Sequence, residues 1–156
     1  MKIILIRHAE KPKKGDNLTC QGFNRSVKLP AIIRERYGVP GYIYVPSIGR
    51  GESTKHSRMF QTVLPLAIKY NLAINSQFKV DDSMGLAADI LKKKGTVLVV
   101  WQHTAIPRIV NALGIRGTPK WPEDDYDSIW TIDFSGSKPK MKIEKENLTA
   151  SESCAF

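Results

Sequence analysis

The chain opens with Lys2-Ile3-Ile4-Leu5-Ile6-Arg7-His8-Ala9-Glu10, in which a continuous apolar run ends abruptly at an arginine and a histidine. An unbroken run rich in β-branched residues is typical of a strand that is buried on both faces of a parallel sheet. A second run, Thr96–Trp101, has the same form and is followed by Gln102 and His103. Ligands of open α/β sheets bind at the carboxyl ends of the strands. We therefore expect His8 and His103 at one ligand-binding rim.

The remaining segments alternate between helix and strand patterns. The expected elements are a strand at 2–6, a helix capped by Thr19 that runs to about 37, a strand at 42–45, helices at 57–70, 83–93 and 104–113, and a hairpin formed by 129–134 and 140–144. Pro30 and Pro65 are expected to disturb the two helices that contain them. Alternation of this kind predicts an α/β fold: a three-layer α/β/α sandwich with a mostly parallel central sheet and an antiparallel edge hairpin near the C-terminus. We expect one domain over residues 1–147 and a flexible tail over 148–156.

Composition narrows the classes of partner. The 156 residues carry a formal net charge of +9, which favours anionic ligands. No apolar stretch approaches the roughly 20 residues that span a bilayer, so a membrane protein is not expected. Nucleic acid is not the expected partner, because the chain has no basic-aromatic sheet motif, zinc knuckle or basic region joined to heptads. The sequence says nothing about oligomeric state.

The two cysteines, Cys20 and Cys154, lie at opposite ends of the chain and form no CxxC pair. This arrangement favours free thiols and a reducing cytoplasmic location over a disulfide framework. A metal site built from His8, His56 and His103 is not expected either, because the sequence has no HxH or HxxxH pair.

Four motifs together resemble the histidine phosphatase superfamily, the phosphoglycerate-mutase-like fold. They occur in the family's order over residues 1–113: Arg7-His8-Ala9-Glu10 after the first strand, Leu18-Thr19-x-x-Gly22, Ser57-Arg58-x-x-Gln61-Thr62 followed by Pro65-Leu66-Ala67, and Val97–His103 followed by Ile106. Ala9 stands where the family has glycine, and a small residue is thereby retained. The resemblance implies the fold expected above and a site that handles phosphoryl groups.

The resemblance also implies roles for individual residues. His8 would attack phosphorus and become a phosphohistidine, while Arg7 and Arg58 would hold the phosphoryl oxygens with bidentate donors. His103 would donate to an oxygen that gains charge in the transition state, and Thr104 beside it would contact substrate. Guanidinium charges near His8 should keep its imidazole neutral, as a nucleophile requires. No metal or other cofactor is expected.

The general acid is the open assignment. Thr104 occupies the position where one branch of the family has an aspartate. In the region that matches the other branch, Asp82 is the first candidate and Asp81 the second. Glu10 and the aspartates within 124–127 remain alternatives. Arg25, Arg50 and Lys55 either contact an anionic substrate tail or are solvated, and His56 either lines the site or is an exposed loop residue.

These residues predict a metal-independent phosphatase that hydrolyses phosphate monoesters, or phosphorylated protein side chains, through a phosphohistidine on His8. The chain is short and lacks insertions that would enclose a substrate, which favours hydrolysis over mutase transfer. The alternative function is a weak or inactive family member that binds phosphorylated ligands without turnover. The expected partner is thus a small phosphorylated substrate or a phosphoprotein.

Overall fold

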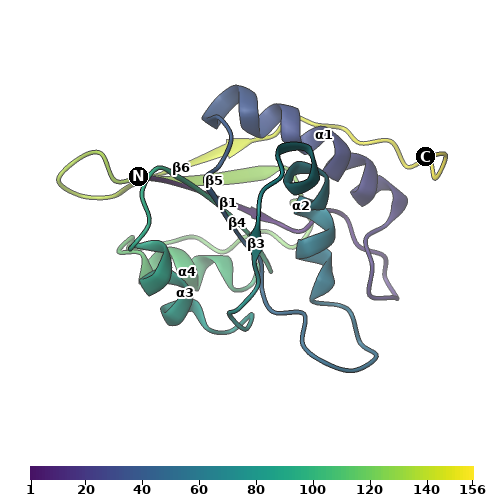
Figure 1. Ribbon diagram of the computed structural model, residues 1–156, viewed down its shortest axis with the longest axis horizontal. Helices are drawn as coiled ribbons and strands as arrows, with labels where there is room; N and C mark the ends of the chain where they lie inside the picture. Colours follow the sequence, from purple (N-terminus) through teal and green to yellow (C-terminus); the bar gives the residue numbers. More distant parts are fainter.

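A six-stranded mixed sheet forms the middle layer of the protein, whose computed structural model describes residues 1–156 (Figure 1). Its strands are β1 (Lys2–Arg7), β2 (Tyr42–Tyr44), β3 (Ile74–Asn75), β4 (Thr96–Trp101), β5 (Ser128–Asp133) and β6 (Lys140–Lys145), in the order β3-β2-β4-β1-β5-β6. The first four strands in that order are parallel, and β5 and β6 run antiparallel to their neighbours. The predicted mostly parallel sheet with a C-terminal antiparallel pair is confirmed.

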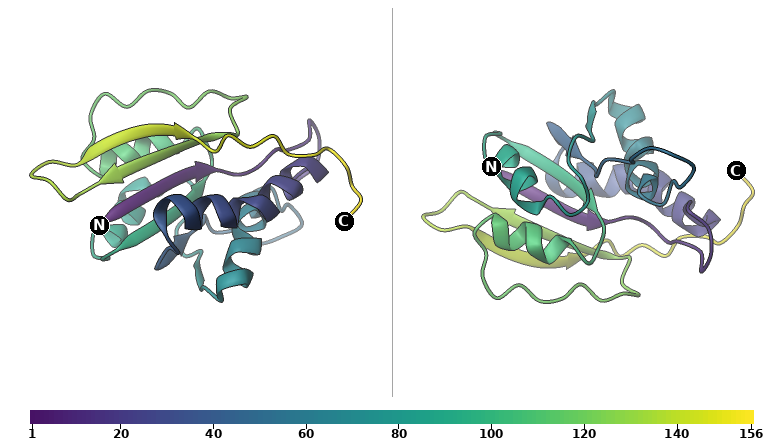
Figure 2. Two further views of the ribbon diagram at one scale, coloured as in Figure 1. Left: turned by 90° about the horizontal axis from the view of Figure 1, so that it is seen from above. Right: turned by 90° about the horizontal axis from the view of Figure 1, so that it is seen from below.

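Helices cover both faces of this sheet. Helices α1 (Cys20–Tyr37) and α2 (Ser57–Tyr70) lie on one face, and α3 (Ser83–Ile90) and α4 (Ile106–Ala112) lie on the other (Figures 1 and 2). The predicted three-layer α/β/α architecture is therefore confirmed. The sequence did not predict β3, because a strand of two residues is too short to show an alternating pattern. The helix predicted over 83–93 ends three residues earlier, at Ile90.

The apolar run of β1 is continuous because each face of the strand has its own core. Ile3 and Leu5 pack in the cluster formed with α3 and α4, whereas Ile4 and Ile6 pack in the cluster formed with α1 and α2. All four side chains are buried. Alternate side chains point to opposite faces of a strand, so β1 has no solvent-facing side. The same holds for β4, and these two neighbouring strands form the centre of the sheet.

Strands β1 and β4 end side by side. Arg7 pairs in register with Trp101, and the backbone N–H of His8 donates to the Trp101 carbonyl at 3.2 Å. The chain beyond each strand therefore leaves the sheet at the same rim, carrying His8 from one strand and His103 from the other. This register is what places the two histidines together.

Both prolines lie inside helices that run on through them. Pro30 is within α1 and Pro65 is within α2, and neither helix is broken at its proline. The two prolines therefore do not interrupt either helix, contrary to the expected disturbance. Pro30 is buried, as are its neighbours Leu29 and Ile33 in the same helix, so packing offsets the loss of one helical hydrogen bond.

The prediction that the cysteines are unpaired is wrong. Cys20, the first residue of α1, forms a disulfide with Cys154, and their Cα atoms are 5.1 Å apart. The final segment runs extended along α1, where Asn24 donates to the carbonyls of Ser151 and Ser153 at 2.8 Å (Figure 2). The flexibility of residues 148–156 remains a prediction. The disulfide attaches this segment to α1 at Cys154, which the prediction did not include.

The disulfide also bears on location. Structural disulfides persist mainly in oxidising compartments, so this bond does not favour the cytoplasm, which remains a prediction. No helix combines the length and apolar character needed to cross a bilayer.

We predict that the double variant Cys20→Ser, Cys154→Ser is less stable than the oxidised protein by about 2–5 kcal/mol, because the bond closes a loop with a sequence separation of 134. Thermal unfolding followed by circular dichroism should show a midpoint lower by roughly 5–15 °C. The wild-type protein with its disulfide reduced should have the same unfolding midpoint as the variant. Equal midpoints for the oxidised protein and the variant would contradict a stabilising bond.

Candidate active site

A cavity of about 210 Å³ opens at the shared rim of β1 and β4, beside the first turn of α2. It is lined by His8, Lys11, Lys55, His56, Arg58, Met59, Gln102 and His103. Three of the residues assigned to the site from sequence, His8, Arg58 and His103, thus line one cavity. His56 lines it too, which decides between the two readings left open for that residue.

His8 is buried and held in one tautomer. Its exposed fraction is 3%, and its Nδ1 lies 2.7 Å from the Ala9 carbonyl oxygen. A carbonyl only accepts, so Nδ1 carries the proton and Nε2 keeps the lone pair. The backbone at Ala9 is fixed in turn, because its N–H donates to the Thr62 hydroxyl of α2 at 2.9 Å. The available nucleophilic atom of this side chain is therefore Nε2.

The surroundings of His8 disfavour its protonation. Burial, together with the smaller effects of the charges of Arg7, Arg58 and His103, lowers its pKa from 6.5 to about 4 against the opposing effect of the Ala9 carbonyl bond. The imidazole is consequently neutral at pH 7, the form that the proposed chemistry requires.

Arg7 is also buried, with an exposed fraction of 3%. Its Nη1 donates to the Glu123 carbonyl at 2.5 Å, and its guanidinium lies 3.9 Å from the centroid of the Tyr126 ring. Its Nε and Nη2 are buried without a hydrogen-bond partner. Arg7 does not line the cavity, yet its charge lowers the pKa of both His8 and His103. Tyr126, which covers Arg7, was not found by sequence reasoning.

Arg58 is fixed from the loop that follows β1. Its Nη2 donates to the Gly15 carbonyl at 2.5 Å, while its Nε is buried without a partner. Gln61, one turn further along α2, accepts from the Leu18 backbone N–H at 3.0 Å and donates to the Asn17 side chain at 2.8 Å. The motif Ser57-Arg58-x-x-Gln61-Thr62 thus joins α2 to both the loop at 11–18 and the backbone of Ala9.

His103 lies in the turn between β4 and α4. Its Nδ1 is buried without a hydrogen-bond partner. Burial and the charges of Arg7 and Lys11 lower its pKa, while Glu123 acts in the opposite direction. Arg7, Arg58 and His103 each have a buried nitrogen atom without a hydrogen-bond partner, and the charge of each lowers the pKa of His8. Guanidinium N–H groups of this kind suit the oxygens of a phosphoryl group.

The remaining predicted residues are elsewhere. Asp82 caps α3 by accepting from the Gly85 N–H at 2.9 Å, and neither Asp82 nor Asp81 lines the cavity. Thr104 is exposed and does not line it. The late-loop aspartates include Asp125, which accepts from Ser128 and Lys145. No carboxylate of any residue lines the cavity, so the structure brings none of the candidate acids to it.

All three histidines of the chain line this cavity, but they do not converge into a group that can hold a metal ion. The positive lining instead suits an anion. Among the residues weighed for an anionic substrate tail, Lys55 lines the cavity and Arg50 does not.

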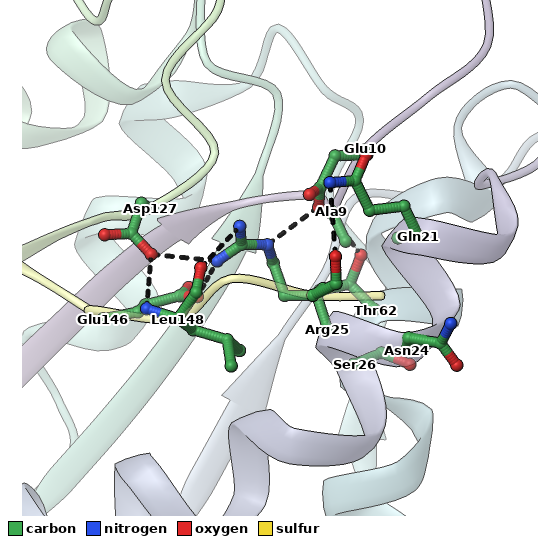
Figure 3. Close-up of polar contacts among 12 residues, drawn as sticks. Ala9, Glu10, Gln21, Asn24, Arg25, Ser26, Thr62, Asp127, Glu146 and Leu148 are labelled. Carbon is green, nitrogen blue, oxygen red and sulfur yellow. Dashed lines mark hydrogen bonds and ion pairs between the residues drawn. The ribbon is translucent and has the colours of Figure 1, made fainter. Parts of the chain in front are cut away.

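Arg25 was weighed as a substrate contact, and the structure corrects this. It is buried and forms ion pairs with Glu10 at 2.8 Å, Glu146 at 2.6 Å and Asp127 at 3.0 Å (Figure 3). A fourth bond goes to the Leu148 carbonyl at 3.1 Å. Glu10 is thereby committed to Arg25, which leaves it poorly placed as a proton donor.

Steric constraints explain why the motif Leu18-Thr19-x-x-Gly22 ends in glycine. Thr19 caps α1 by accepting from the Gly22 N–H at 3.1 Å, and a Cβ atom at Gly22 would overlap the Glu10 carbonyl oxygen. Only glycine lets α1 approach the backbone two residues beyond His8 this closely.

The chain is similar to known proteins in fold and not in sequence. No family model matches the chain, and no curated protein sequence does. Solved structures do match over nearly the full length. The protein histidine phosphatase SixA complexed with tungstate is 15% identical, with a TM-score of 0.69, covering 94% of this chain and 97% of that one. The chain has the histidine phosphatase fold.

A variant of the phosphoserine phosphatase of Entamoeba histolytica, in complex with phosphoserine, is 14% identical with a TM-score of 0.64, covering 94% of this chain and 98% of that one. The same enzyme in complex with 3-phosphoglyceric acid is 16% identical with a TM-score of 0.55, covering 96% of each chain. Identities this low establish the architecture alone, and the roles of individual residues remain predictions.

We predict that the Arg25 cluster makes stability depend on pH near neutrality. Burial raises the pKa of Glu146 from 4.5 to about 7, against the opposing effect of Arg25, so the folded state holds a proton that the unfolded state has released between these values. Stability is then highest below this window and falls as pH rises through it, by about 1–3 kcal/mol. Urea unfolding at pH 5, 6, 7 and 8 measures this fall.

Glu146→Gln is the matched variant, because an amide cannot ionise but still accepts from Arg25. Its stability should decline less than that of wild type between pH 5 and 8. Parallel stability curves for the two proteins would show that Glu146 does not titrate in this range.

We predict that His8 remains neutral down to a pH of about 4. Nuclear magnetic resonance of its ring protons, assigned by comparison with His8→Ala, measures the titration. Arg58→Gln should raise the pKa of His8, because it removes a like charge that lowers it. An unchanged midpoint in Arg58→Gln, or a midpoint near 6.5 in wild type, would contradict this electrostatic account.

Proposed function

We propose that the protein is a metal-independent phosphatase that hydrolyses phosphate monoesters through a phosphohistidine on His8. The observation that carries this proposal is the state of the His8 ring: buried, neutral, and held with Nδ1 donating to Ala9 so that Nε2 keeps its lone pair. Arg7 and Arg58, whose charges act on His8 and which keep unpartnered nitrogens, support the same function, because guanidinium groups are donors suited to phosphoryl oxygens.

In the first step, Nε2 of His8 attacks phosphorus, the bond from phosphorus to the ester oxygen breaks, and its electron pair goes to the leaving oxygen. The Nδ1 proton remains on the ring, where the Ala9 carbonyl stabilises the positive charge that the phosphorylated imidazole acquires. Arg58 stabilises the non-bridging oxygens, Arg7 contributes its positive charge from outside the cavity lining, and His103 donates to one of the oxygens. In the second step, water attacks phosphorus, the bond from phosphorus to Nε2 breaks and its electron pair returns to Nε2. Inorganic phosphate leaves, and the proton that the water loses is taken up through solvent by the oxyanion released in the first step.

The chemistry of the leaving group determines whether its oxygen or nitrogen must be protonated as it departs. Since no carboxylate lines the cavity, leaving groups that need little protonation are the favoured substrates. Aryl phosphates and phosphorylated imidazoles are of this kind, so protein side chains phosphorylated on tyrosine or histidine are included in the proposed substrate class. A small phosphorylated molecule or a phosphoprotein is accordingly the proposed partner, and the cytoplasm is retained as the proposed location.

One observation favours a second candidate, a module that binds phosphorylated ligands without turnover. Asp82 and Asp81, the carboxylates first assigned as general acid, do not line the cavity, and turnover of alkyl phosphates needs a proton donor. The cationic lining would still bind the phosphoryl group. Turnover measurements separate the two candidates directly.

We predict hydrolysis of para-nitrophenyl phosphate in the presence of excess EDTA, and a fall in kcat of at least about 10³-fold in His8→Ala, because the nucleophile is lost. Circular dichroism of the variant should match that of wild type. Rapid quenching should trap a phosphoryl label on wild type that is stable in alkali and lost in acid, as a phosphohistidine is.

Near-normal turnover by His8→Ala would rule out the mechanism. Binding of the substrate analogue vanadate without any turnover by wild type would establish the binding module instead.

A further inference from the structure

A mainly apolar groove lies between α1 and α2, apart from the cavity of the candidate active site. Its volume is about 620 Å³, and its lining includes Phe23 and Val27 of α1 and Leu64 and Ile68 of α2. In each helix the two residues are four positions apart, which puts them on one face. Val27 is 53% exposed and Ile68 is 70% exposed. Folding therefore leaves apolar side chains of both helices at the surface along this groove.

The last residue of the chain lies at the groove. Phe156 lines it, and the centroid of its ring is 4.5 Å from that of Phe23. The final segment reaches this position from β6 by running along α1 (Figure 2). An aromatic pair at this separation contributes only modestly to stability, and Phe156 is still 74% exposed. The ring thus covers part of the groove but is not anchored there by burial.

The disulfide is the strongest attachment of this segment. The final six residues, 151–156, are all exposed, and the bonds that Asn24 donates to the carbonyls of Ser151 and Ser153 are exposed as well. Water competes for such hydrogen bonds, so each contributes little. The bond from Cys20 to Cys154, two residues before the end of the chain, is not subject to that competition. Without it, the segment would be held by weak contacts alone.

The two sulfur atoms differ in a way that favours reduction. Cys154 is exposed and Cys20 is partly buried, so a reducing thiolate meets Cys154 first. Cys20 then becomes the leaving group. It is the first residue of α1, whose first turn has no acidic side chain. The N-terminus of a helix stabilises negative charge, and a stabilised thiolate leaves more readily.

We propose that residues 151–156 form a redox-controlled strap. In the oxidised protein the disulfide keeps Phe156 at the groove, and reduction by a dithiol releases the strap and opens the groove to apolar ligands. The residues just before the strap stay in place, because Ala150 is buried and the Leu148 carbonyl accepts from Arg25.

The reduction is an ordinary exchange between thiols and disulfides. One thiolate of the dithiol bonds to the Cys154 sulfur, the bond between the two cysteines breaks, and its electron pair goes to the Cys20 sulfur. The second thiolate of the dithiol attacks its own sulfur in the mixed disulfide and displaces Cys154. Each cysteine sulfur takes up one proton, and the dithiol is oxidised to its disulfide.

The strap does not contact the bonds that fix the loop after His8. The Thr19 N–H donates to the Glu10 carbonyl at 2.9 Å, and the Leu18 N–H donates to Gln61 at 3.0 Å. Both bonds remain when the strap is released, so turnover of para-nitrophenyl phosphate should be the same in the two redox states. The strap is therefore independent of the proposed phosphatase function and stands or falls separately from it.

The test measures binding of the dye anilinonaphthalene sulfonate, by fluorescence titration, to the oxidised protein and to the protein in excess dithiothreitol. Alkylation and mass spectrometry count the free thiols, and circular dichroism shows that the fold is retained. Cys154→Ser releases the strap permanently, and Phe156→Ala removes the covering ring but keeps the disulfide. Ile68→Glu places a charge in the groove at an exposed position, so it should block the groove without unfolding the helix.

Reduced wild type should bind the dye about two- to tenfold more tightly than oxidised wild type, because the dye no longer competes with an aromatic contact. The nuclear Overhauser contact between the rings of Phe23 and Phe156 should disappear on reduction. Cys154→Ser should bind the dye tightly with or without dithiothreitol, and Phe156→Ala should do so even when oxidised. Ile68→Glu should show no gain on reduction.

Three results would overturn the strap. A folded protein that yields no free thiols in dithiothreitol would have a permanent cross-link. Equal dye binding before and after reduction would show that the segment stays in place without its disulfide. A gain on reduction that persists in Ile68→Glu would place the dye outside the groove between α1 and α2.

Discussion

The guanidinium of Arg25 is the constraint on which the geometry behind His8 depends. It joins three segments that are remote in sequence: Glu10 on the chain leaving β1, Asp127 just before β5, and the segment of Glu146 and Leu148 that follows β6. A buried ion cluster is not in itself strong evidence of stability, because desolvation opposes the attraction between the charges. Removal of Arg25 would nevertheless destabilise the fold, because its buried carboxylate partners would be left unpaired beside one another. Breaking a buried ion pair in this way lowers the free energy of unfolding by about 3–5 kcal/mol. The cluster therefore specifies one arrangement of these segments, and the backbone next to His8 is part of that arrangement.

On the other side of His8, burial and charge act in the same direction. Burial alone lowers the pKa of the imidazole, and the positive charges nearby add to this effect. Those charges disfavour a proton on Nε2 and favour an anion beside it, so one electrostatic environment serves both to keep the nucleophile available and to attract the phosphoryl group. The carbonyl of Ala9 completes the arrangement, because it holds the remaining proton on Nδ1 without contributing a full negative charge that would repel the ligand. A carboxylate in that position would also fix the tautomer, but it would raise the pKa of the imidazole and reduce the field acting on the ligand.

The sequence predicted the parts of the molecule that short-range patterns encode. The α/β/α layers followed from the unbroken apolar strands and from the Thr19 cap. The positions of His8 and His103 at the ends of two such strands were sufficient to predict that they lie close together. Contacts between remote segments were beyond such patterns. Nothing local distinguishes Arg25, in the middle of α1, from an exposed helical arginine, and its partner Glu146 lies 121 residues further along. The disulfide joins residues separated by 134 positions in a chain with only two cysteines, and Tyr126 reaches Arg7 from a loop with no regular structure. Asp82 was chosen because of its place in the sequence, but its carboxylate is a helix cap, which is a common role for aspartate.

The lack of a carboxylate and the presence of lysines in the cavity have a common electrostatic consequence. A carboxylate in so small a space would repel a phosphoryl dianion and would pair with Lys11 or Lys55, so it would weaken the binding that the lining favours. A proton donor of that kind therefore conflicts with strong attraction for a substrate with several negative charges. On the proposed mechanism, the rate should then depend steeply on the basicity of the leaving oxygen, since little proton transfer offsets the charge that develops there.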